Sequence, residues 1–232
     1  TDLPDEMVFI IYHQINELLF KMILWEMEQL ASKENLKAFF LTERLERISS
    51  YFDMLCSSFK IMKDGMELVQ YMKFRKTLAP ASGFQSAQYR KIEFASTELI
   101  NLIDFRFRKT INRNTPFKYA FEHLYWQAAG KNHETGEKSI MIKLFEDQYM
   151  DEFILFMKQY NNKNIWSLFN NLPDQEKNNL ELINSMRHYD HTVNVKWVMQ
   201  HFHTASLYLD GANKVEKATG GSNWKKYMHP KY

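Results

Sequence analysis

Residues 42–62 read TERLERISSYFDMLCSSFKIM, and this stretch predicts a long helix with one apolar face. Its apolar side chains recur at alternating spacings of three and four residues, at Leu45, Ile48, Phe52, Leu55, Phe59 and Met62. This spacing is typical of the seam of a helix that packs against another helix. We expect Thr42 to cap the helix and Gly65 to end or bend it.

The residues before this segment predict a second long helix, from Pro4 to about Leu30. Proline is tolerated in a first helical turn, and Asp5 and Glu6 favour the positive end of the helix dipole. The most apolar stretch, residues 8–25, is interrupted by polar and charged side chains. It is therefore a poor candidate for a membrane span.

Further helices are expected downstream, joined by loops. The predicted helical stretches run through Tyr71 and Arg75, over about residues 86–111, from Pro116 to Gly130, over residues 140–160, and from Pro173 to about Leu209. Residues 78–83 and those after Gly211 read as loops. Seven Gly and five Pro are few for the turns of a sheet fold. We expect an all-α fold, a bundle of long helices, with residues 1–232 in one domain.

Composition narrows the class of protein. Thirty Lys and Arg against 28 Asp and Glu are mixed along the chain, which does not suggest nucleic-acid binding. The single cysteine, Cys56, excludes an intrachain disulfide and favours a cytoplasmic location; its place in the apolar seam argues against catalysis. The chain does not begin with Met, so we expect native residues to precede it.

Two histidines suggest a cofactor site. His13 shares a mostly apolar helix face with Phe9, and His201 follows Trp197 by one turn. A single histidine on such a face is usually a core residue, but two that face each other across a bundle interior would suit haem. A di-iron site is a weak rival, because no histidine has Glu three residues before it.

Two further motifs suggest a site for an amino acid. Arg75 precedes the loop Pro80-Ala81-Ser82-Gly83, where a guanidinium, a hydroxyl and exposed amides would make a carboxylate receptor. Near the end of the chain, Thr219-Gly220-Gly221-Ser222 would let the backbone approach a ligand closely.

Taken together, three blocks resemble the tryptophan 2,3-dioxygenase family. They are Asp5-Glu6-Met7 through Phe9-Ile-Ile-Tyr-His13-Gln14 to Leu18, then Phe74-Arg75 with Leu78-x-Pro80-x-Ser82-Gly83-Phe84-Gln85-Ser86, and then Thr219-Gly-Gly-Ser222. The resemblance implies an enzyme with haem b that inserts both atoms of O₂ into L-tryptophan to give N-formyl-L-kynurenine, the first step of the kynurenine pathway. It also implies a homotetramer, a dimer of dimers.

The resemblance also implies roles for individual residues. His13 would hydrogen-bond the indole N–H, Phe9 would pack on the indole, and Arg75 would bind the substrate carboxylate. Thr219 would contact the ammonium and carboxylate groups, and Ser82 would lie near a haem propionate. The remaining pocket residues would be Ile10, Ile11, Tyr12, Tyr71 and Gly83.

Two alternatives stay open at this point. The segment Lys196-Trp197-x-x-x-His201 resembles the one before the family's axial histidine, which makes His201 the predicted iron ligand, with His203 and His191 as rivals. The function alternatives are a haem dioxygenase acting on a modified indole and a non-catalytic haem or tryptophan sensor.

Overall fold

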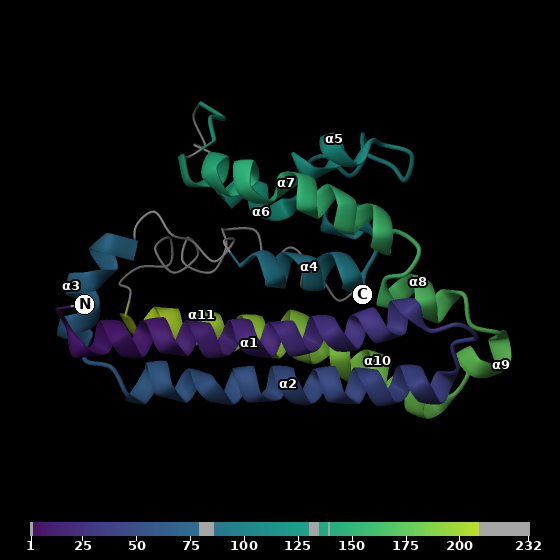
Figure 1. The fold of residues 1–232 in the computed structure, drawn as a ribbon, viewed down its shortest axis with the longest axis horizontal. Helices are drawn as coiled ribbons and strands as arrows, with labels where there is room; N and C mark the ends of the chain where they lie inside the picture. The colour runs from purple at the N-terminus through teal and green to yellow at the C-terminus, as the bar shows by residue number, and fades with distance from the viewer. Residues whose placement is uncertain (1, 79–85, 130–134, 139, 209–232) are drawn as a thin grey trace.

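The computed structural model describes residues 2–78, 86–129, 135–138 and 140–208, and the regular structure of these residues is helical (Figure 1). Apart from one isolated bridge between Ile103 and Leu124 and a single bridge residue, Lys138, no β-structure occurs among them. The prediction of an all-α fold is confirmed.

The two longest helices, α1 (Pro4–Ser32) and α2 (Ala38–Asp64), lie side by side along the molecule (Figure 1). Pro4 occupies the first turn of α1, and Gly65 follows the last residue of α2, as predicted. In the short connection Asn35 takes a left-handed conformation, φ 51°, which asparagine tolerates better than most residues. The predicted seam of α2 is fully buried at Leu45, Ile48, Phe52 and Leu55.

The start of α2 differs from the prediction. The helix begins at Ala38, four residues before the expected cap at Thr42. The amide of Ala38 donates to the Glu176 carboxylate, with 2.7 Å between N and Oε2. A side chain far away in the sequence therefore satisfies an amide of the first turn, which the local sequence does not reveal.

The prediction of one long helix from Pro173 to Leu209 is wrong. The segment consists of α9 (Asp174–Lys177), α10 (Leu180–His191), a π-helical turn η3 (Thr192–Lys196) and α11 (Trp197–Tyr208). Asn179 starts a new helix because its side chain accepts a hydrogen bond from the amide of Leu182, at 3.1 Å. Helices α10 and α11 pack against α2 and complete the bundle with α1.

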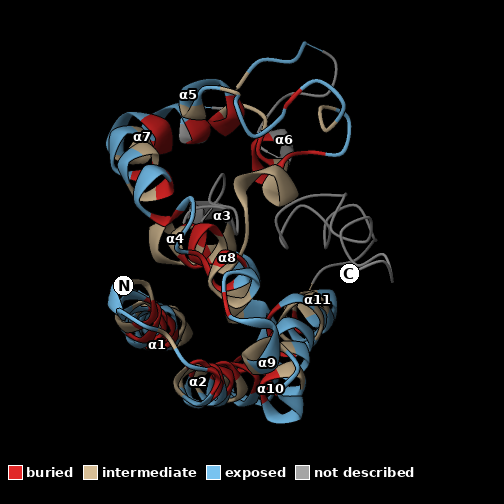
Figure 2. Cartoon of the chain, turned by 90° about the vertical axis from the view of Figure 1, so that its right-hand side faces the viewer, coloured by how far each residue is buried: buried red, intermediate tan, exposed pale blue. Residues whose placement is uncertain are grey.

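A second group of helices lies beside this bundle (Figures 1 and 2). It comprises α4 (Ala87–Ser96), α5 (Phe117–Phe121), α6 (Tyr125–Ala129) and α7 (Ile140–Tyr160), and α8 (Ile165–Asn170) follows α7. The predicted helix over residues 140–160 is confirmed. The helix expected from Pro116 to Gly130 is instead two short helices, and Gly130 lies outside the described residues.

The helix predicted over residues 86–111 is also shorter than expected. Ser86 caps α4 by accepting from the amide of Tyr89 at 3.1 Å, near the predicted start, but the helix ends at Ser96. A 3₁₀ turn, η2 (Leu99–Leu102), follows. The buried Asp104 then accepts from the amide of Arg106 at 2.9 Å and pairs with its guanidinium. This local bonding competes with continuation of the helix.

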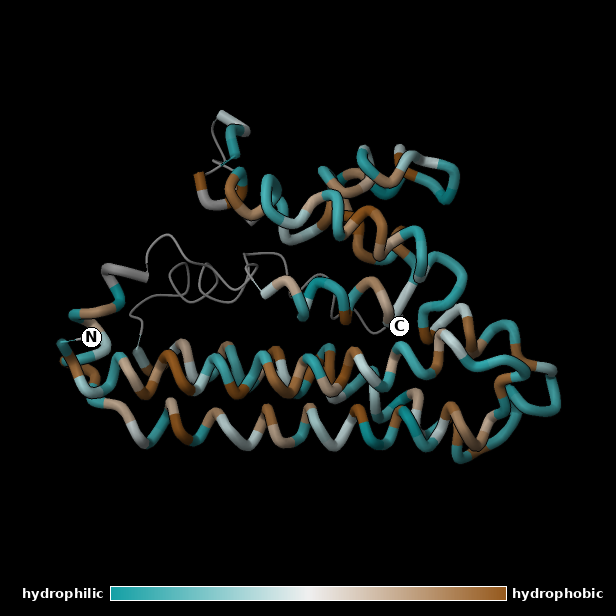
Figure 3. The backbone as a smooth tube through the Cα atoms, viewed as in Figure 1, coloured by the Kyte–Doolittle hydropathy of each residue, from teal (hydrophilic) through white to brown (hydrophobic). Residues whose placement is uncertain are grey.

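Three apolar clusters hold the helices together. The largest lies between α1, α2, α10 and α4, and a second is formed by α4, α5, α6 and α7. The third is centred on Tyr12, Phe59 and Met62, where α1 and α2 lie near α3 (Leu68–Leu78). Buried faces of the helices point towards one another in Figure 2, and apolar positions alternate with hydrophilic ones along α1 and α2 in Figure 3.

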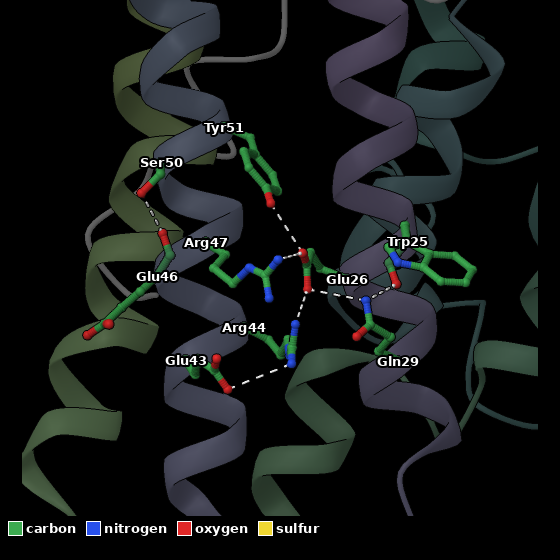
Figure 4. Close-up of polar contacts among 9 residues, drawn as sticks. All are labelled: Trp25, Glu26, Gln29, Glu43, Arg44, Glu46, Arg47, Ser50 and Tyr51. Carbon is green, nitrogen blue, oxygen red and sulfur yellow. Dashed lines mark hydrogen bonds and ion pairs between the residues drawn. The ribbon is translucent and has the colours of Figure 1, made fainter.

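A buried carboxylate joins α1 to α2 away from the third cluster (Figure 4). Glu26 is 2% exposed and accepts from Arg44 at 2.8 Å, Tyr51 at 3.2 Å and Gln29 at 3.3 Å. Arg47 forms a second ion pair with it at 3.1 Å. Because its charge and both oxygens are satisfied, we interpret Glu26 as a structural group.

Helix α1 also meets the length and hydropathy expected of a membrane span, with a mean hydropathy of 1.3 over its most apolar window. The core helix of a water-soluble protein passes the same test, so this is weak evidence for a membrane. In this structure one face of α1 packs on α2 and α4.

Candidate functional site

Aromatic side chains from four helices meet at one end of the bundle, which we call the aromatic end. Its members are Phe9 and Tyr12 of α1, Phe59 of α2, Tyr71 and Phe74 of α3, and Trp197 of α11. Ring centroids lie 4.9 Å apart for Phe59 and Trp197 and 5.5 Å apart for Phe9 and Phe74. The third apolar cluster thus extends onto α3 and α11.

His13 lies against this end with a defined tautomer. Its ring centroid is 4.1 Å from that of Phe9, and its Nδ1 is 2.7 Å from the carbonyl oxygen of Phe9. A carbonyl can only accept, so Nδ1 carries the proton, and in the neutral ring Nε2 keeps a free lone pair. Part of the ring is exposed, yet desolvation by the surrounding helices lowers the pKa of His13 and favours the neutral form. Nε2 can therefore accept a hydrogen bond from a ligand N–H.

His201 of α11 lies beside Phe59, with ring centroids 5.8 Å apart. Burial, and secondly the nearby His13, lower the pKa of His201 to about 4. The ring is therefore neutral near pH 7, the form in which imidazole binds metals. Ring contacts from His13 to Tyr12, from Tyr12 to Phe59 and from Phe59 to His201 place these two histidines, 188 positions apart in sequence, in one region.

Tyr71 and Arg75 reach the same region from α3. The ring centroids of Tyr71 and Phe9 are 6.2 Å apart. Burial raises the pKa of Tyr71, and the positive charge of Arg75, which lies one helical turn later on the same face of α3, partly offsets this rise. Arg75 is half-buried, and no carboxylate among the described residues forms an ion pair with it. The arrangement offers a cation and aromatic surface beside a neutral histidine.

The three candidate ligand histidines differ in how far they are buried. His203 and His191 are exposed, whereas His201 is half-buried beside Phe59. Helix α11 starts directly after the π-helical turn at residues 192–196, whose last residue, Lys196, pairs with Asp53 of α2 at 2.6 Å. This geometry favours His201 over its two rivals.

Comparison with known proteins identifies the family of this chain. A sequence model of the family described as tryptophan 2,3-dioxygenase matches residues 1–206. The chain belongs to the tryptophan 2,3-dioxygenase family. Because 206 of its 232 residues fall within the match, the assignment covers every described helix except the last two residues of α11.

Individual members of the tryptophan 2,3-dioxygenase family align over shorter stretches. The enzyme of Ruegeria sp. (strain TM1040) is 41% identical over 97 residues, which are 40% of this chain and 34% of that protein. Tryptophan 2,3-dioxygenase B of Danio rerio and the enzyme of Rattus norvegicus are each 35% identical over 96 residues, 38% of this chain and 23% of each relative. The aligned part of the chain thus spans about a third or less of these relatives.

The remaining predicted pocket residues of this family member fall into two groups. Tyr12 is buried, and its hydroxyl accepts from Ser58 at 3.4 Å, while Ile10 and Ile11 are 37% and 47% exposed. Ser82, Gly83 and Thr219 lie outside the described residues. The structure therefore brings His13, His201, Phe9, Tyr71 and Arg75 together, and it leaves Ile10 and Ile11 open on the surface of α1.

Two residues of this region were not predicted from the sequence as site residues. Phe59 contacts Tyr12 of α1 and His201 of α11, but its regular place in the seam of α2 identifies it only as a core residue. Tyr208, in the last turn of α11, contacts Tyr71 at 4.7 Å between ring centroids. Neither has a distinguishing local motif, because its role arises from packing between helices.

Cys56, by contrast, is a core residue as the sequence indicated. It is 7% exposed, and burial raises the pKa of its thiol to about 11. Since the thiolate is the reactive form, this group is poorly suited to catalysis near neutral pH.

Proposed function

We propose that this protein is a haem-dependent dioxygenase that inserts O₂ across the indole C2–C3 bond of L-tryptophan to give N-formyl-L-kynurenine. The observation that carries the proposal is that His13 and His201 lie in one region at the aromatic end, with Arg75 one helical turn after Tyr71, which contacts Phe9. Membership of a dioxygenase family supports the same reaction.

The residues present fit a haem b. His201 supplies a neutral imidazole, the form required of an axial ligand to iron, and the Phe59 ring lies beside it. His201 would hold the iron, and the bound haem would supply the activation of O₂, which no protein side chain provides. The protein's own contribution is to bind and orient the substrate and to exclude water.

The indole ring and the carboxylate of tryptophan would each bind a complementary group of the protein. Phe9 would pack on the indole ring, and Nε2 of His13 would accept the indole N–H, because the Phe9 carbonyl already engages Nδ1–H. Arg75 would bind the carboxylate, with Tyr71 as a wall of the pocket. Ser82, Gly83 and Thr219 are proposed to complete the pocket and to bind the ammonium group.

The decisive experiment starts from the purified protein loaded with hemin. It is reduced, supplied with L-tryptophan and air, and monitored for the absorbance of N-formylkynurenine. We expect turnover in the wild type and loss of the haem Soret band in His201→Ala. His203→Ala and His191→Ala are matched controls that should keep the haem.

Three outcomes would contradict parts of this proposal. Haem binding without turnover would indicate a sensor, and turnover of a substituted indole but not of tryptophan would indicate a different substrate. Retention of a histidine-ligated spectrum in His201→Ala would move the iron ligand to another histidine.

We also propose that the protein assembles as a homotetramer. One face of α1 carries exposed apolar side chains along its length, among them Ile11, Leu18, Met22 and Trp25. A continuous apolar face is typical of a surface that a partner covers. The molar mass in solution, measured by light scattering, tests this.

A further inference from the structure

Tyr208 connects the end of α2 to α11. Its hydroxyl donates a hydrogen bond to the carbonyl oxygen of Met62. Met62 lies in the last turn of α2 (Ala38–Asp64), where carbonyl groups have no partner within the helix. The amide of Gly65 satisfies the preceding carbonyl, that of Ile61, at 3.0 Å. Tyr208 therefore caps a carbonyl that the helix leaves open.

The ring of the same residue supports the wall of the proposed pocket. Its centroid is 4.7 Å from that of Tyr71, with the ring planes at 52°. Tyr71 in turn meets Phe74 edge to face at 5.4 Å and lies 6.2 Å from Phe9. Tyr71 thus has Tyr208 as one neighbour and Phe9, whose ring packs against His13, as another.

Helix α3 (Leu68–Leu78) has a second tether at its N-terminal end. The Asp5 carboxylate accepts from the amide of Glu67 at 2.7 Å, and the amide of Asp5 donates to Gln70 at 3.2 Å. These bonds fix the start of α3 to α1. The contact between Tyr71 and Tyr208 fixes the next part of α3, and Arg75 lies one helical turn beyond it.

We propose that Tyr208 is a positioning residue for tryptophan, which holds Tyr71 and, through α3, Arg75 in the place that the substrate requires. The proposal rests on the function proposed above. A hydroxyl hydrogen-bonded at one end and a ring packed against Tyr71 at the other leave this side chain little freedom. A small displacement of a binding group strongly weakens productive binding. Removing the Tyr208 ring should therefore weaken substrate binding more than it slows the chemical step.

The test compares Tyr208→Leu and Tyr208→Phe with the matched control Tyr51→Leu. Tyr51 also joins two helices through its hydroxyl, which donates to Glu26, but it lies in the Glu26 cluster of Figure 4. We expect Tyr208→Leu to raise KM for L-tryptophan about tenfold with kcat nearly unchanged, the pattern of lost ground-state binding. Tyr208→Phe keeps the ring and should show a smaller rise, and Tyr51→Leu should leave KM unchanged.

A second measurement does not depend on turnover. Hydrogen exchange of the α3 amides, recorded on the same proteins, should be faster in Tyr208→Leu than in the wild type and unaffected in Tyr51→Leu.

An unchanged KM in Tyr208→Leu, or an equal rise of KM in Tyr51→Leu, would overturn the proposal. If Tyr208→Leu does not fold, Tyr208→Phe decides by the same criteria. If the wild type shows no turnover, the proposed function fails, and unchanged α3 exchange would then overturn the role of Tyr208 as well.

Discussion

At the scale of single residues, the site depends on protonation and pairing. His13 donates through Nδ1 to its own helix, which leaves Nε2 for a ligand, and burial keeps His201 neutral. Arg75 has the opposite character, since it is a cation without a carboxylate partner among the described residues. A half-buried guanidinium of this kind is suited to an anionic ligand.

We predict that Arg75→Ala weakens transition-state binding of L-tryptophan by about 2–5 kcal/mol, as does truncation of one partner of a buried charge pair. This loss is measured as a lower kcat/KM. Arg75→Lys should recover only part of the lost kcat/KM, because an ammonium group cannot make the two parallel hydrogen bonds of a guanidinium. Steady-state kinetics measure both variants. Arg187→Ala, which removes an exposed arginine of α10, is the control, and normal kinetics in Arg75→Ala would rule out its role as the carboxylate clamp.

At the scale of helices, α1 and α2 are held together by apolar packing along their length and by the Glu26 cluster. The Glu26 and Arg44 side chains are 3% and 13% exposed, so water screens their interaction weakly. Removing one partner of such a pair leaves an uncompensated charge in the interior.

We therefore predict that Glu26→Ala lowers the free energy of unfolding by about 3 kcal/mol, because Arg44 loses its buried partner. Glu28→Ala removes an exposed carboxylate from the same helix and should change it by less than about 0.5 kcal/mol. Urea denaturation followed by circular dichroism gives both values. Equal losses in the two variants would show that Glu26 contributes no more than a surface charge.

At the scale of the whole molecule, α4 connects the bundle to the second group of helices. Its buried Arg90 pairs with Glu93 at 2.8 Å and donates to the Tyr125 hydroxyl of α6 at 3.0 Å. Burial raises the pKa of Glu93, while the charge of Arg90 and the bond from Tyr125 partly lower it. On the other side, Tyr89 packs on Phe20 of α1 at 5.4 Å between ring centroids.

We predict that Arg90→Met destabilises the protein by about 3–5 kcal/mol, since Glu93 is left buried without its cation. The double variant Arg90→Met/Glu93→Gln should be less destabilised than the sum of the two single variants, because it removes both charges. Urea denaturation of all three tests this. Additive losses would show that the two side chains do not act as a pair.

The sequence predicted the long elements well and their interruptions poorly. The seam of α2 and the start of α1 follow from apolar spacing and from Pro4, which are local signals. The break at Asn179 depends on the hydrogen bond that its side chain accepts from the amide of Leu182, and α4 ends where Thr97 takes an extended conformation; apolar spacing alone indicates neither. The start of α2 at Ala38 depends on Glu176, 138 residues away.

The sequence also indicated the residue types of the site. These are His13 on an apolar helix face, Arg75 before a loop with Pro and Gly, and His201 one turn after a tryptophan. Only the tertiary structure decided which of them meet. It brings His13, His201, Tyr71 and Arg75 to one end of the bundle, leaves His191 and His203 exposed, and adds Phe59 and Tyr208 to the group. Spacing along a chain fixes which face of one helix a residue occupies, whereas packing between helices fixes what that face meets.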